Sequence, residues 1–248
     1  MAESDKAETT TADSAVAVVG PELPEVPPMS KRLFLVRHGE VINPGPEVFG
    51  KDKPVYYGAM DVELSPLGKA EATAAAQYLS QFDLECVFAS PLSRAVFGAE
   101  ETKRFQSKEI ILTLNEGFRE LDRGIWCGKT KDEIGKEAMA KFDACDESVT
   151  PQGGESYPFL KSRVLKARDE CLDKMSPGRA AAVISHLQVT RSMLSDALDI
   201  PIDKMAGLKI ATASVTCIDY DMVTGTQTVH FQSFKPDVGL DESKDKAN

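Results

Sequence analysis

Two histidines in this sequence directly follow apolar runs: His38 after residues 33–36 and His186 after residues 181–184, with one residue between run and histidine. Arg37 precedes the first histidine, and Arg94 follows a third apolar run. Two arginines and two histidines in one pocket describe an anion site, because a guanidinium group bonds two phosphate oxygens at once. Strand-to-helix turns add backbone amides that also favour a phosphate. These residue types therefore indicate phosphate chemistry.

A neutral histidine in a cationic pocket can attack phosphorus and form a phosphohistidine. Neighbouring positive charge lowers its pKa and keeps it unprotonated near neutral pH. The leaving alkoxide needs a proton, for which Glu120 is the candidate general acid, in competition with Glu116 and Asp122. A glutamate in that role needs a raised pKa or a phosphate dianion beside it. The mechanism requires no metal or cofactor, since the arginines and the second histidine can stabilise the developing charge.

Apolar strands alternate with helices along the body of the chain, which predicts an α/β sandwich with a mostly parallel sheet. The expected buried strands are residues 33–36, 86–89, 109–114 and 181–184, followed by a hairpin of 214–219 and 226–231. Ser65-Pro66, Ser90-Pro91 and Ser156 are expected to cap helices, because serine and then proline are typical of a helix start. Apolar residues recur at helical spacing between 160 and 175.

Ligands of such sheets bind outside the carboxyl ends of the strands. The motif residues all follow expected strands: Arg37 and His38 the first, Arg94 the second, Glu120 the third and His186 the fourth. The topology therefore gathers them into one crevice, where Gly39 would let the backbone approach a ligand closely.

The two ends of the chain differ from its body in charge. Of the net charge of −10, residues 1–30 carry −5 and residues 237–248 carry −2, which leaves −3 for residues 31–236. The first segment is poor in large apolar side chains, so we expect a disordered acidic tail over 1–30. We expect a catalytic domain over 31–236 and a flexible tail over 237–248.

The acidic balance argues against nucleic acid as a partner, and no apolar run is long enough to span a membrane. Five widely spaced cysteines and three scattered histidines predict neither a disulfide framework nor a metal site. The N-terminus lacks the pattern of a signal or transit peptide, so we expect a cytoplasmic protein. The expected partner is a small phosphorylated substrate.

Five motifs in order resemble those of the histidine phosphatase (phosphoglycerate mutase-like) superfamily. They are residues 35–40 (LVRHGE), 90–95 (SPLSRA), 120–130 (ELDRGIWCGKT), 153–157 (GGESY) and 184–186 (ISH). The third and fourth are most similar to the fructose-2,6-bisphosphatase branch. The resemblance covers most of the body and implies a three-layer α/β/α sandwich, with a homodimer as a family-level expectation.

The resemblance also implies roles for the motif residues. His38 is the phosphate-accepting nucleophile, and Glu120 is the proton donor. Arg37, Arg94 and His186 hold the phosphoryl oxygens. We predict Gly39, Asn43, Arg119 and Ser156 as further substrate-binding residues.

The sequence also departs from the family pattern. The family often has asparagine six positions after the nucleophile, where this chain has Pro44, and Asn43 is one position short. The loop over residues 43–58 is longer than usual. Arg119 and Arg123 flank the acid and could reach a second anionic group, or they could be solvated surface arginines. Ser156 could line the pocket or simply cap a helix.

Three functions fit the motifs to different degrees. The first is a phosphatase acting on a small phosphorylated metabolite such as a sugar phosphate or bisphosphate. A mutase is less favoured, because residues 129–150 are a short segment with six acids and four lysines, whereas mutases of this family carry a long basic insertion. A non-catalytic phospho-ligand-binding module is least favoured, because no reacting residue is missing.

Overall fold

A computed structural model describes residues 19–238; the parts of the predicted tails before residue 19 and after residue 238 lie outside it. The described residues contain one sheet with the strand order β3-β2-β4-β1-β5-β6. The strands are β1 (Ser30–Arg37), β2 (Leu84–Ala89), β3 (Ile111–Leu114), β4 (Ala180–Ser185), β5 (Val215–Asp221) and β6 (Gln227–Phe234). Strands β1 to β4 pair in parallel, whereas β5 pairs antiparallel with β1 and β6. The mostly parallel sheet and the terminal hairpin are thus confirmed.

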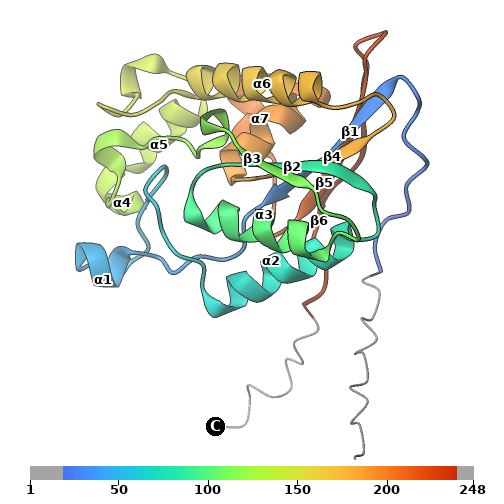
Figure 1. The fold of residues 1–248 in the computed structure, drawn as a ribbon. Coiled ribbons are helices and arrows are strands. Elements are labelled where there is room, and N and C mark those ends of the chain that lie inside the picture. The colour runs from blue at the N-terminus through green and yellow to red at the C-terminus, as the bar shows by residue number, and fades with distance from the viewer. Residues whose placement is uncertain (1–18, 239–248) are drawn as a thin grey trace, which may run out of the picture.

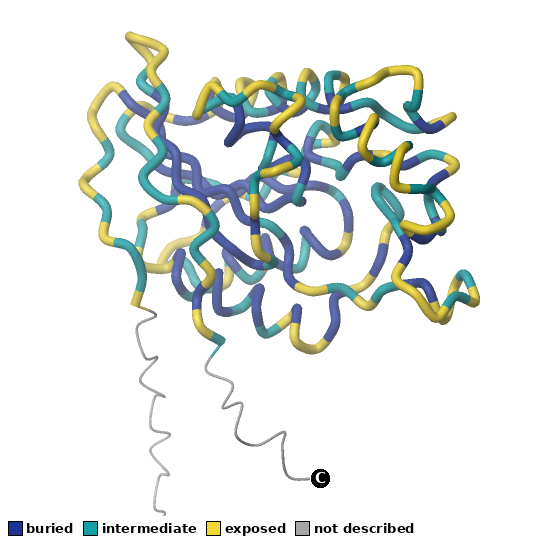
Figure 2. Tube along the Cα trace, turned by 180° about the vertical axis from the view of Figure 1, so that it is seen from behind, coloured by how far each residue is buried: buried dark blue, intermediate teal, exposed yellow. Residues whose placement is uncertain are grey.

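Helices cover both faces of the sheet (Figure 1). Helices α2 (Pro66–Leu79) and α3 (Ser93–Phe105) lie on one face, and α6 (Tyr157–Lys174) and α7 (Leu187–Ala197) lie on the other. Side chains of β1 alternate between two cores: Leu33 and Leu35 pack with α6 and α7, and Phe34 and Val36 pack with α2 and α3. A strand buried on both faces must be apolar throughout, which explains the continuous run. The three-layer sandwich is confirmed, with the central strands β1, β4 and β5 in its buried interior (Figure 2).

Two of the three predicted serine caps are present. The Ser65 hydroxyl accepts from the amide of Gly68 at 3.0 Å, and Ser156 accepts from Phe159 at 3.4 Å. The expected helix start at Ser90 is wrong, because α3 begins at Ser93 without a side-chain cap. The Ser90 hydroxyl instead lies 2.7 Å from His186 Nε2. The Ser90 side chain, which the local sequence predicts as a helix cap, therefore makes a tertiary contact with His186.

Short elements occupy the long connections. Helices α1 (Gly45–Phe49), α4 (Lys131–Ile134) and α5 (Lys136–Asp143) gather at one end of the molecule (Figure 1). An isolated bridge between Val55 and Thr130 ties the loop after α1 to the start of α4. Single 3-10 turns lie at Glu116–Phe118, Gly124–Trp126 and Glu147–Val149, and a longer 3-10 helix spans Ile202–Gly207.

Residues 19–29 contain no helix or strand but contact the domain. The Pro21 carbonyl accepts from the Tyr78 hydroxyl at 3.3 Å, and the Pro24 carbonyl accepts from Arg32 at 2.8 Å. Leu23 and Val26 pack against the α2–α3 core. The sequence assigned this segment to a tail because its apolar side chains are few; the structure places two of them on the core.

Candidate active site

The register of β1 against β4 brings the two histidines together. Arg37 is level with Ser185 in this parallel pair, so His38 and His186 are the next residue on each strand. The His38 amide donates to the Ser185 carbonyl at 2.9 Å. The two rings meet edge to face, with centroids 5.1 Å apart. Two histidines nearly 150 residues apart thus become neighbours through backbone pairing alone.

His38 has one ring nitrogen fixed and one available. Its Nδ1 lies 2.7 Å from the Gly39 carbonyl oxygen, which can only accept, so Nδ1 carries the proton. Nε2 therefore keeps its lone pair. Burial first, and then the charges of Arg94 and Arg37, lower the pKa of His38 to about 3. The imidazole is neutral at physiological pH, as a nucleophile must be.

His186 is fully buried beside it. Its Nε2 shares a hydrogen bond with the Ser90 hydroxyl at 2.7 Å, and its Nδ1 is buried without a partner. Burial, followed by His38 and the two arginines, lowers the pKa of His186 well below its ordinary value. This ring is also neutral, and it has a hydrogen-bonding atom still unused.

Each motif arginine is held by backbone carbonyls and keeps a buried N–H group unpaired. Arg37 donates from Nη1 to the Ile210 carbonyl at 2.7 Å. Arg94 donates to the Met60 and Gly58 carbonyls at 2.8 and 2.9 Å. The Nε atoms of both are buried without a hydrogen-bond partner. An unpaired buried donor costs about 1–3 kcal/mol, a cost that an anion bound beside it removes.

Glu120 is fixed by two backbone amides. Its Oε1 accepts from the amide of Leu121 at 2.8 Å, and its Oε2 accepts from the amide of Gln188 at 3.4 Å. Gln188 lies in the first turn of α7, two residues beyond His186. The carboxylate is thereby connected to the strand end that carries the second histidine.

A cavity of about 230 Å³ brings these groups to one surface. Its wall consists of Arg37, His38, Val55, Tyr56, Tyr57, Gly58, Glu120, Arg123, Leu187 and Gln188. Three of the five predicted catalytic residues are in this wall. His186 and Arg94 are not part of this wall and are 0% and 1% exposed; the His186 ring contacts that of His38, and the charge of Arg94 lowers the pKa of His38.

The four further predicted binding residues lie outside this wall. Asn43 bonds within its own loop, accepting from the amides of Gly45 and Val55 at 2.9 and 3.2 Å. Arg119 pairs with Glu116 at 3.5 Å, and Ser156 caps α6. A Cβ atom at Gly39 would lie 2.0 Å from the carbonyl of Gly68. Glycine is therefore required at 39 by the approach of α2.

Sequence reasoning did not assign Tyr56, Tyr57 or Gln188 to the site. The two tyrosines belong to the long loop that follows β1. The bridge between Val55 and Thr130 holds this loop to the start of α4, and both tyrosines line the cavity. The Arg94 guanidinium lies 5.4 Å from the Tyr57 ring. For Gln188 a signal existed, since it is two residues beyond His186 at a helix start, where ligands approach α/β sheets.

Residues 19–238, which the structure describes, lack two kinds of feature. No helix among them is both long enough and apolar enough to cross a bilayer. No three of their histidine, cysteine and acidic side chains are grouped so as to hold a metal ion.

The sequence matches the histidine phosphatase superfamily (branch 1) over residues 33–231. A phosphoserine phosphatase 1 of Hydrogenobacter thermophilus is 30% identical over 75% of this chain and 85% of its own length. The fructose-2,6-bisphosphatase TIGAR B of Danio rerio is 32% identical over 62% of this chain and 58% of its own length. These matches agree with the family and branch that the motifs resemble.

A mutase and a solved structure are also similar. A 2,3-bisphosphoglycerate-dependent phosphoglycerate mutase of Cytophaga hutchinsonii is 26% identical over 85% of this chain and 97% of its own length. The solved structure of Bacillus stearothermophilus YhfR superposes with a TM-score of 0.71 at 26% identity, covering 82% of this chain and 97% of that one. Phosphatases and a mutase thus share this sequence pattern.

Proposed function

Because the chain belongs to the histidine phosphatase superfamily, we propose that it hydrolyses a phosphate monoester by way of a phosphohistidine on His38. One observation carries the proposal: Nδ1 of His38 is fixed by the Gly39 carbonyl, while burial lowers the pKa of the ring to about 3. The Nε2 lone pair is then available at physiological pH in a residue of the cavity wall.

The first step transfers the phosphoryl group to the protein. His38 Nε2 forms a bond to phosphorus as the bond from phosphorus to the ester oxygen breaks. The departing alkoxide takes a proton from the Glu120 carboxyl group. Arg37, Arg94 and His186 bind the non-bridging oxygens, whose charge needs partners while bonds form and break.

The second step releases phosphate. A water molecule attacks phosphorus, and its proton passes to the Glu120 carboxylate. The N–P bond electrons return to Nε2, which restores neutral His38. One carboxyl group thus acts first as acid and then as base, and the cycle ends with alcohol, phosphate and unchanged enzyme.

The proposed substrate is a small phosphorylated metabolite in the cytoplasm. The cavity of about 230 Å³ suits a molecule of a few carbon atoms better than a macromolecule. The names of the similar phosphatases, for phosphoserine and for fructose 2,6-bisphosphate, denote substrates of that kind.

The second candidate function is that of a phosphoglycerate mutase, which the Cytophaga relative favours. In a mutase the phosphohistidine returns its phosphoryl group to the bound product instead of to water. The segment that follows the acid motif forms the short helices α4 and α5 and the 3-10 turn at Glu147–Val149, without a long basic insertion over residues 129–150. That observation weighs toward the phosphatase.

Product analysis separates these functions. Purified protein is incubated with p-nitrophenyl phosphate and, separately, with 3-phosphoglycerate. We expect release of inorganic phosphate, abolished in His38→Ala. Conversion of 3- to 2-phosphoglycerate without phosphate release would establish the mutase instead. If the wild-type protein catalyses neither reaction but still binds inorganic phosphate, both enzymatic functions are overturned. A phospho-ligand-binding module then remains.

A further inference from the structure

Arg123 lines the same cavity as His38 but takes no part in the phosphoryl transfer just described. It is 8% exposed, and its Nη1 is buried without a hydrogen-bond partner. A buried guanidinium usually pairs with a carboxylate, since an unpaired buried charge is costly. No carboxylate among residues 19–238 forms an ion pair with Arg123. Its charge is therefore available to a ligand.

Aromatic rings support this arginine in place of an acid. The guanidinium carbon lies 5.0 Å from the ring centroid of Tyr56 and 5.4 Å from that of Phe142. Such contacts attract the cation without cancelling its charge. The neighbouring carboxylate of Asp143 is engaged elsewhere, accepting from the Tyr157 hydroxyl at 3.1 Å. The cation is held in place, and no carboxylate of residues 19–238 lies within ion-pair distance of it.

The backbone around Arg123 is also fixed. The next residue, Gly124, has φ of +46° and donates its amide to the Asp122 carboxylate at 2.8 Å. A Cβ atom at Gly58 would lie 2.7 Å from Arg123 Cγ, so the loop over the cavity touches this side chain closely. A rigid cation in a cavity wall loses little entropy on binding an anion.

We propose that Arg123 binds a second anionic group of the substrate, a carboxylate or a second phosphate, while the transferred phosphate lies at His38. The assignment rests on the proposed function and makes it more specific. Both cations, Arg37 and Arg123, line one cavity of about 230 Å³, so both anionic groups belong to one small molecule. The substrate class is a small phosphate monoester that carries another oxyanion.

The test compares substrates that differ in the second anion. The carboxylate arm uses 3-phosphoglycerate against glycerol 3-phosphate, and the phosphate arm uses fructose 1,6-bisphosphate against fructose 6-phosphate. In wild type we expect kcat/KM to be at least tenfold higher for the member that carries the second anionic group, in at least one pair. Arg123→Met should lower that ratio tenfold or more, and Arg123→Lys, which keeps the charge but loses the planar fork, should lower it less.

A matched control comes from the other arginine that stacks on a ring. Arg104 lies 4.2 Å over Phe105 on the exposed end of α3, away from the cavity wall. Arg104→Met should keep the wild-type ratio. If Arg123→Met leaves the ratio of kcat/KM values unchanged, including by lowering kcat/KM equally for both members of each pair, the assignment is overturned. Arg123→Gln replaces Arg123→Met if the latter does not show a cooperative melting transition.

Binding separates failure of this inference from failure of the proposed function. Calorimetry on His38→Ala measures affinity for 3-phosphoglycerate and glycerol 3-phosphate without turnover. A tenfold preference for 3-phosphoglycerate that disappears in His38→Ala/Arg123→Met would support the subsite even if the wild type hydrolysed nothing. Hydrolysis by wild type, with neither pair discriminated in binding or in kcat/KM, would leave the phosphatase standing and remove the subsite.

Discussion

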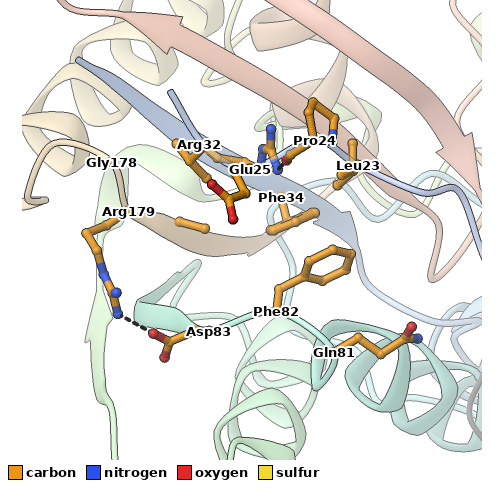
Figure 3. Close-up of a pocket in the computed structure, with 12 residues that line it drawn as sticks. Leu23, Pro24, Glu25, Arg32, Phe34, Gln81, Phe82, Asp83, Gly178 and Arg179 are labelled. Atoms are coloured by element: carbon orange, nitrogen blue, oxygen red, sulfur yellow. Dashed lines mark hydrogen bonds and ion pairs between the residues drawn. The ribbon is translucent and has the colours of Figure 1, made fainter. Parts of the chain in front are cut away.

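Each of the two ends of the central sheet carries a cavity with arginines in its wall. The arginines at one end pair with carboxylates, and those at the other end do not. At the amino ends of the strands, a hollow of about 580 Å³ lies beside residues 23–26 (Figure 3). There Arg32 pairs with Asp219 at 2.6 Å, and Arg179 pairs with Asp83 at 2.8 Å. At the carboxyl ends, the cavity is about 230 Å³, and Arg37 and Arg123 keep buried N–H groups without partners.

The difference supports placing the proposed anion site by charge compensation instead of by cavity size. In the larger hollow the arginines are already satisfied by carboxylates, and Phe34 and Phe82 pack together with ring centroids 4.6 Å apart. An anion entering there would have to displace an internal carboxylate. In the smaller cavity an anion would meet donors that nothing else in the described chain uses, beside a neutral histidine.

The largest contrast is expected between His38 and Arg179. His38→Ala removes the proposed nucleophile and should lower kcat for phosphate release about a thousandfold or more. Arg179→Met alters only the wall of the larger hollow and should stay within about twofold of wild type. Steady-state phosphate release on both variants makes the comparison. A His38→Ala protein with a tenth of wild-type activity would refute the assignment of the site to the carboxyl ends.

A second contrast separates activity from stability. Arg37→Met should lower kcat/KM about a hundredfold through lost charge at the phosphate, with little loss of stability. Arg32→Met should cost about 3 kcal/mol of unfolding free energy, because the buried Asp219 keeps only His230, at 2.8 Å, as a partner. Urea denaturation and steady-state kinetics give the two quantities for each variant. A loss mainly of stability in both variants would contradict the assignment of Arg37 to phosphate binding.

The two buried histidines should make stability depend on pH. Burial first, then nearby charge, lowers both pKa values: to about 3 for His38, and well below the ordinary value for His186. The unfolded chain binds these protons below about pH 6.5 and the folded protein does not. Unfolding free energy should therefore fall as pH drops below about 6.5, by about 1.4 kcal/mol per pH unit for His38 down to about pH 3, and His186 should add to the fall in the same direction.

His38→Asn isolates one of these contributions. Urea denaturation of wild type and variant at pH 6.0 and 5.0 should give slopes that differ by about 1.4 kcal/mol per pH unit, with the variant flatter. Carboxylates titrate in both proteins and cancel in the difference. Identical slopes would mean that His38 is protonated in the folded protein, which would argue against its role as nucleophile.

The smallest effect is expected at the exposed acid of the larger hollow. Asp83 forms ion pairs with Lys108 and Arg179, and its side chain is 61% exposed. Exposed ion pairs contribute little to the stability of the fold. Asp83→Asn should therefore lower the unfolding free energy by about 0.5 kcal/mol and leave kcat within about twofold of the wild-type value. A fall in kcat as large as that of Arg37→Met would show that the hollow takes part in the reaction.

The sequence predicted the parts of the fold and site that depend on periodicity and strand order. Continuous apolar runs located β1, β2 and β4, and the carboxyl-end rule placed His38, Glu120 and His186 at one edge of the sheet. The strand register then brought the histidines together, as expected from parallel pairing. These features follow from local pattern, so sequence alone could reveal them.

The rest depends on tertiary contacts that no local pattern records. Ser90 looked like a helix cap but bonds His186, because β2 and β4 are neighbours in the sheet. The sequence left open whether Arg123 is a surface residue. In the structure it is buried in the cavity wall, where it packs against Tyr56 of the long loop. In the same loop, the Asn43 side chain accepts a hydrogen bond from the amide of Gly45 and is thereby engaged within the loop. Long loops follow their contacts, which sequence periodicity does not encode.

The most direct test of the central claim is to find the phosphoryl group on the protein. Wild-type protein is mixed with excess p-nitrophenyl phosphate, denatured in alkali within milliseconds and examined by ³¹P NMR and peptide mass spectrometry. We predict one phosphoryl group, stable in alkali and labile in acid, bonded to nitrogen in the peptide that contains His38 and absent from His38→Ala. Steady turnover with no phosphoryl group on that peptide, or with one on another residue, would contradict the account.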